Sequence, residues 1–130
     1  MTISLPIYYT QEFKTKPNKT HLVGMNTFRN AHHFLQNNMK KHFHQLVQEQ
    51  LKPTEQPLTR FSVSYELYYK SPVCDASNII ALIEKFYLDA IKEYGLVIDD
   101  NVNYHLSSSW RVVNQDKENP RVEITLKELQ

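Results

Sequence analysis

Three carboxylates flank one segment of the chain in a pattern that could hold a divalent metal ion. Asp75 directly precedes a stretch with helical periodicity, and the pair Asp99-Asp100 follows that stretch. Hard divalent cations prefer oxygen ligands, and one or two carboxylates with water and a substrate phosphate suffice for Mg²⁺. An ion held in this way activates water and neutralises charge on a phosphate under attack. The pattern therefore indicates metal-assisted phosphodiester chemistry, provided that the fold brings the acids together.

Each acid also has an ordinary structural explanation. Asp75 before a helix is favoured by the helix dipole, and Asp99-Asp100 followed by Asn101 is typical of a solvated turn. A helix over 79–94 would be about 24 Å long, so its two ends meet only if the chain after Gly95 folds back along it. A strand beginning near Asp100 would then lie beside the strand that ends near Asp75.

The elements that must position these acids follow from the spacing of apolar residues. The sequence predicts the following segments: a strand over 3–9, a loop over 10–24, a helix over 27–50, a strand over 58–70, a helix over 79–94, a strand over 102–113 and a strand over 121–129. Ser77 or Asn78 is expected to cap the second helix, and Gly95 is expected to end it. The order β-α-β-α-β-β predicts one α/β (α+β) domain over 1–130, with a small mixed sheet and two main helices.

The composition excludes several classes of protein. The chain has 130 residues, of which 41% are hydrophobic, so it can form one core. Its only glycines, Gly24 and Gly95, exclude a P-loop and a dinucleotide-binding glycine fingerprint. Its only cysteine, Cys74, excludes an internal disulfide and a multi-cysteine zinc site. Because no apolar run approaches the roughly 20 residues of a membrane span and no signal-peptide pattern opens the chain, we expect a soluble cytoplasmic protein.

Charge is distributed unevenly along the chain. Residues 1–60 hold eight Lys or Arg against three acids, whereas residues 61–130 hold seven against eleven. Three of the basic residues, Lys14, Lys16 and Lys19, lie in the expected loop over 10–24. Such an asymmetry suits a protein that binds a polyanion with one part and metal with another, and a solvated surface with uneven charge is the alternative explanation.

The stretch from 73 to 105 resembles the signature of the RusA family of Holliday-junction resolvases. That signature has Asp-x-Asp-Asn at the start of a helix, then a lysine, an Asp-Ala-Leu element, a glycine and an Asp-Asp pair. The matching residues are Asp75, Asn78, Asp89-Ala90-Ile91, Gly95 and Asp99-Asp100. The span between Asn78 and the Asp-Asp pair is about one helical turn longer here, and a turn inserted before Ile83 places Lys85 on the family lysine. The opening ISLP and the order of elements extend the likeness over most of the chain.

This resemblance implies a small homodimer that cuts four-way DNA junctions by paired nicks, with Mg²⁺ or Mn²⁺ as cofactor, in a family common in phages. The likeness also implies that Asp75 and Asp100 hold the metal, with Asp99 as a third candidate ligand. Lys85 would stabilise the charged transition state and contact DNA. Lys14, Lys16 and Lys19 would bind backbone phosphates.

One position departs from the family pattern, because Ser77 stands where the family has its second aspartate. A hydroxyl is a poorer, uncharged ligand for Mg²⁺. Asp99 or Glu66 would compensate for the weaker ligand, and Asn78 is a further possible accessory residue. Alternatively, the chain would be a junction-binding protein that cuts weakly or not at all. A protein-interaction module whose acids cap helices is the remaining alternative.

Overall fold

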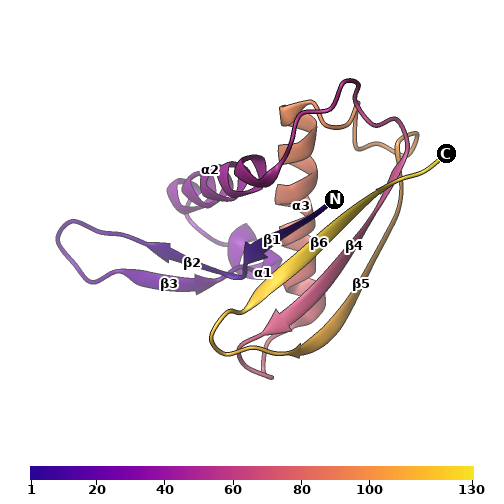
Figure 1. Ribbon diagram of the computed structural model, residues 1–130. Helices are drawn as coiled ribbons and strands as arrows, with labels where there is room; N and C mark the ends of the chain where they lie inside the picture. Colours follow the sequence, from indigo (N-terminus) through magenta and orange to yellow (C-terminus); the bar gives the residue numbers. More distant parts are fainter.

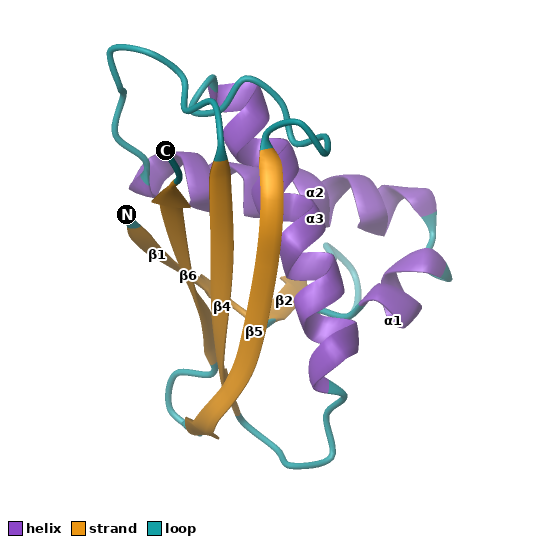
Figure 2. Cartoon of the chain, turned by 90° about the vertical axis from the view of Figure 1, so that its right-hand side faces the viewer, coloured by secondary structure: helices purple, strands orange, loops and turns teal.

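The computed structural model describes residues 1–130 as a mixed α+β fold, in which helices cover one face of a four-stranded sheet (Figures 1 and 2). The strands are β1 (Thr2–Pro6), β6 (Arg121–Glu128), β4 (Phe61–Tyr69) and β5 (His105–Gln115), in that order across the sheet. The β1–β6 and β6–β4 pairs are antiparallel, whereas β4 and β5 are parallel. The α/β (α+β) class and the small mixed sheet expected from the sequence are thus confirmed.

Three helices accompany the sheet. They are α1 (Met25–Arg29), α2 (His33–Gln50) and α3 (Ala76–Tyr94). The expectation of one helix over 27–50 is wrong, because local hydrogen bonds end α1 and start α2 separately. The backbone N–H of Phe34 donates to His32 Nδ1 over 3.2 Å, and the Gln36 amide donates to the Phe28 carbonyl over 2.6 Å. None of the helices combines the length and the apolar character that a bilayer crossing requires.

The segment expected to be a loop over 10–24 contains a β-hairpin, which we call the arm. Its strands are β2 (Tyr8–Gln11) and β3 (Lys19–Leu22), and Figure 1 shows it extending away from the sheet. The Thr10 and Thr20 hydroxyls lie 3.0 Å apart across it. The expected strand over 3–9 is therefore two strands, β1 and β2, which Ile7 separates.

The core lies between the helices and the sheet. Alternate residues of β4 are buried, as their spacing predicted: Phe61, Val63, Tyr65 and Leu67. One stripe of α3 covers them, and Phe86 from this helix stacks on Phe43 of α2 with ring centroids 5.2 Å apart. Because β4 and α3 pack through these faces, the acids before and after α3 are carried on a rigid β4–α3–β5 unit.

Candidate functional site

Asp75 is the N-cap of α3. Its carboxylate accepts the backbone N–H of Asn78 over 3.4 Å and the hydroxyl of Ser77 over 3.0 Å. A side-chain oxygen at this position satisfies an N–H group that has no partner within the helix. The expectation that Ser77 or Asn78 caps the helix is therefore wrong, and Ser77 instead supports the capping carboxylate.

Asp99 and Asp100 lie in the turn that follows α3. Gly95 ends the helix with a φ of 88°, a left-handed conformation that glycine adopts without a steric penalty. The Asp99 carboxylate lies 2.9 Å from Lys92 Nζ and also accepts the backbone N–H of Asp100 over 2.8 Å. The hydrogen bond from Lys92, followed by that backbone bond, lowers the pKa of Asp99 to about 2. Asp100 is half-buried and forms no ion pair.

The chain returns along α3 only in β5, after Asp99 and Asp100, so the condition for these acids to meet Asp75 within one chain is not fulfilled. The segment after Gly95 instead meets the chain that leads into β4: Leu58 and Val97 form a β-bridge. Strand β5 then starts beside the first residue of β4 and runs parallel to it. The 19 residues of α3 span about 28 Å, and the acids lie at opposite ends of this helix.

These acids therefore do not form one shared metal site within a single chain. No group of three or more His, Cys, Asp or Glu side chains is placed to bind a metal ion. The oxygen donors expected for Mg²⁺ are present, but as two separate half-sets. One half-set is Asp75 at the start of α3, and the other is Asp99-Asp100 beyond its end.

The remaining expected site residues lie at separate places. Lys85 is exposed near the middle of α3 and forms no ion pair. Glu66 lies on the face of β4 opposite the buried Tyr65, and Arg111 of β5 holds its carboxylate. The Asn78 amide oxygen accepts the backbone N–H of Asn26 over 2.8 Å, which ties α1 to α3. Glu66 and Asn78 thus each have a structural partner within the chain.

The arm brings the three expected DNA-contacting lysines together on a projecting element. Lys14 and Lys16 lie in its tip and Lys19 begins β3, and all three side chains are exposed. Lys16 Nζ stands 4.2 Å from the centroid of the Phe13 ring. None of the three lysines forms an ion pair, so their charges are available to an external anion.

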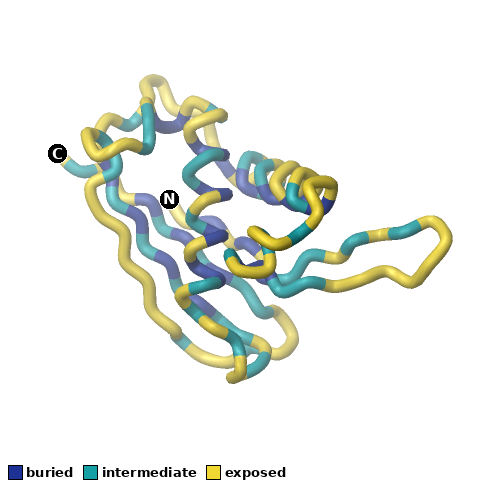
Figure 3. The backbone as a smooth tube through the Cα atoms, turned by 180° about the vertical axis from the view of Figure 1, so that it is seen from behind, coloured by how far each residue is buried: buried dark blue, intermediate teal, exposed yellow.

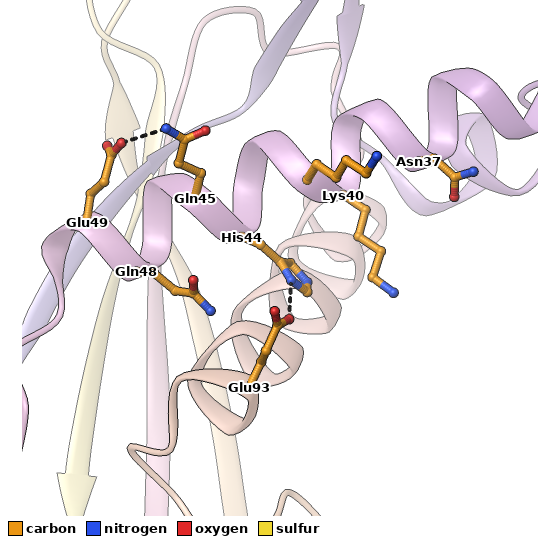
Figure 4. Close-up of a pocket in the computed structure, with 8 residues that line it drawn as sticks. Asn37, Lys40, His44, Gln45, Gln48, Glu49 and Glu93 are labelled. Carbon is orange, nitrogen blue, oxygen red and sulfur yellow. Dashed lines mark hydrogen bonds and ion pairs between the residues drawn. The ribbon is translucent and has the colours of Figure 1, made fainter.

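A polar groove between α2 and α3 presents two further lysines (Figure 4). Lys40 and Lys41 line it, and neither forms an ion pair. His44 Nδ1 lies 3.1 Å from Glu93 Oε2 and links the two helices, as the dashed line in Figure 4 marks. Glu93 is held by His44, whereas the exposed Glu49 forms no ion pair, so this groove offers free charges of both signs.

Strand β5 has an exposed apolar side that was not predicted from the sequence. Leu106, Trp110 and Val112 are 39%, 48% and 46% exposed, although they lie in a strand of the sheet. The run Ser107–Ser109 carries small hydroxyl side chains where a half-buried strand would alternate with apolar ones. That break in alternation is the one signal that could have marked this strand as a free edge.

Comparison with protein-family models and with curated proteins finds no match to this sequence. The geometry and the chemistry of the residues described above are therefore the basis for a functional proposal.

Proposed function

We propose that the chain is a RusA-like, metal-dependent endodeoxyribonuclease that resolves four-way DNA junctions in the cytoplasm as a homodimer. The observation that carries this proposal is the arm, which presents Lys14, Lys16 and Lys19 without acidic partners. A projecting element with unpaired lysines suits the phosphate backbone of DNA, whose negative charge dominates protein–DNA affinity. Lys40 and Lys41 in the groove between α2 and α3 offer a second place for the backbone.

The two acidic half-sets require a second copy of the chain. A twofold axis that reverses the direction of α3 brings the Asp100 end of one copy to the Asp75 end of the other. The pair then has two identical sites, each with carboxylates from both copies. A four-way junction is cut at two matching points, and two sites related by twofold symmetry fit that requirement.

In such a pair, Asp75, Asp100 and Asp99 supply the oxygen donors that Mg²⁺ or Mn²⁺ prefers. The bound ion supplies charge neutralisation and water activation for hydrolysis of the phosphodiester. Asp99 is the weakest candidate ligand, because Lys92 already neutralises it. Lys85 has no acidic partner and is exposed between the two ends of α3, where it can contact a DNA phosphate.

A second candidate function is junction binding with weak or no cutting. The observation that favours it is the contact between Ser77 and Asp75. The capping carboxylate already accepts two hydrogen bonds, and the hydroxyl beside it carries no charge for a metal ion. In this case the lysines would bind the junction while the acids would stabilise the ends of α3.

A labelled synthetic four-way junction separates these functions. The protein is incubated with the junction in Mg²⁺, in Mn²⁺ and in EDTA, and binding is followed by gel shift alongside cleavage. Paired nicks at symmetric positions that require the metal support the nuclease. A gel shift without cutting in either metal supports the binding protein. No shift at low salt would contradict both and would leave a protein-interaction module.

A further inference from the structure

Strand β5 forms an open edge of the sheet along its full length of 11 residues. Only β4 pairs with it, so the backbone N–H and C=O groups on its outer side have no strand to bond. In Figure 3 it is the outermost strand of the sheet and is coloured as exposed over almost all of its path. A row of free backbone groups of this length is a template for another β-strand.

The opposite edge of the sheet lacks this property. Strand β1 has five residues and ends at Pro6, which has no N–H to donate. Gln50 of α2 occupies part of its edge: the amide of this residue accepts from the backbone N–H of Ser4 over 3.0 Å and donates to the Ser4 carbonyl over 2.8 Å. Short length, proline and a covering side chain are ways in which proteins block edges. The fold thus blocks β1 and leaves β5 open.

The side chains of β5 suit a second apolar strand. Trp110 and Val112 pair with Tyr65 and Leu67, so they lie on the face of the sheet that packs against α3, and yet each is nearly half exposed. Val112 also lines an apolar pocket of about 250 Å³ with Leu67 and neighbouring residues. The only Lys, Arg, Asp or Glu on the strand is Arg111, and Glu66 of β4 neutralises it. Neither its length nor its charge protects this edge from pairing.

We propose that β5 pairs antiparallel with β5 of a second copy of this chain, about a twofold axis close to Ser109. This register sets Leu106 opposite Val112 of the partner subunit, so that apolar side chains meet at both ends. It sets the large Trp110 beside the small Ser108 of the partner subunit. Arg111 then faces Ser107 of the partner subunit, and no like charges oppose each other. The edge is therefore complementary to itself, which favours a closed pair over another protein's strand.

This interface would bring together the acids of the proposed nuclease site, and its catalytic role rests on that proposed function. Strand β5 begins after the turn that holds Asp100 and ends beside Tyr69, whose carbonyl accepts the backbone N–H of Asp116 over 2.8 Å. Tyr69 in turn leads to Asp75 through a short turn. Antiparallel pairing therefore sets the Asp100 end of one copy and the Asp75 end of the other at the same end of a joined eight-stranded sheet.

The first test measures the oligomeric state of the intact chain by sedimentation equilibrium without DNA or metal. We expect a dimer for the wild type, and at least a tenfold weaker association for a Trp110→Lys/Val112→Lys variant, because charge at an edge opposes pairing. Phe34→Lys is the matched control: Phe34 is 66% exposed on α2, far from this edge, and its variant should remain dimeric. Circular dichroism of each variant checks that the fold is kept.

A second test detects whether the two β5 strands lie side by side, whatever the strength of the dimer. In a Cys74→Ser background, Ser109→Cys should form a disulfide-linked dimer under mild oxidation, since opposed residues of antiparallel strands have the Cα separation that a disulfide needs. Asn37→Cys, at an exposed position of α2, is the control and should remain monomeric on a non-reducing gel. A monomeric wild type, or a dimer that survives the Trp110→Lys/Val112→Lys change without the Ser109→Cys link, overturns the interface. A β5 dimer that never cuts junctions supports the interface and contradicts the nuclease.

Discussion

Asp75 and Asp100 lie at opposite ends of helix α3, one as its N-cap and the other in the turn beyond Gly95. The separation is imposed by the parallel pairing of β4 and β5, because the chain must travel the length of α3 before it can run beside β4 in the same direction. A site that uses both carboxylates is thus a property of two chains. The most direct test of the proposed nuclease mixes two defective chains.

Asp75→Asn and Asp100→Asn should each abolish junction cutting and leave junction binding intact, since each removes a ligand charge but little volume. Coexpression of the two variants should restore cutting. A mixed dimer contains one site with neither carboxylate and one site with both, so it should nick one strand of the junction instead of two. Strand-specific labels on the junction measure this outcome, and binding is followed by gel shift. Mixed dimers that stay inactive while both parents bind DNA would exclude a site shared between chains.

Ser77→Asp should raise either the cutting rate or the affinity for Mg²⁺. The new carboxylate would stand beside Asp75, where Ser77 now donates a hydrogen bond, and two adjacent carboxylates are a stronger set for a divalent cation. Without metal, their repulsion should lower the midpoint of thermal unfolding, and added Mg²⁺ should recover it. Ser77→Asn, which has a similar volume and no charge, is the control. Equal responses of the two variants to Mg²⁺ would show that the charge at this position is irrelevant.

Replacement of Lys14, Lys16 and Lys19 by Ala should weaken DNA binding and flatten its dependence on salt. Each lost phosphate contact lowers the slope of log K against log salt by about one unit, so the largest expected change is about three. Binding to a labelled junction is measured from low to physiological salt. A matched triple change of Lys52, Lys117 and Lys127, which lie outside the arm and form no ion pairs, should leave the slope nearly unaltered. Equal slopes for the two variants would remove the arm from the interface.

The contact between Lys92 and Asp99 should contribute to acid stability. Because the hydrogen bond from Lys92 lowers the pKa of Asp99 to about 2, the contribution is complete above the ordinary aspartate pKa near 4. It is lost as the pH falls through the lower, folded-state value. Urea unfolding at several pH values between about 2 and 5 should therefore show a shallower loss of stability for Asp99→Asn than for the wild type. The same pH profile in both proteins would mean that the exposed ion pair has no measurable effect.

The sequence predicted the elements whose residues show a local pattern of apolar spacing or a glycine stop. The alternation of β4 and the helical stripe of α3 each mark one buried face, and Gly95 marks the end of α3; all three are confirmed. The arm was missed because its pairing depends on contacts between strands, such as that between Thr10 and Thr20. The break before α2 was missed because it depends on the placement of single side chains, such as His32 at the cap.

For the candidate site, the amino-acid sequence alone determined which groups could bind metal and phosphate: Asp75, Asp99, Asp100 and the lysines of the first 20 residues. Only the tertiary structure decided where these groups lie relative to one another. The strand after α3 could start beside the beginning or the end of β4. Long-range backbone pairing decides between these arrangements, and the residues between the two strands carry no pattern that predicts it. The same pairing leaves β5 at an open edge. A strand lies at an edge when no further strand pairs with it, and its own residues do not determine this.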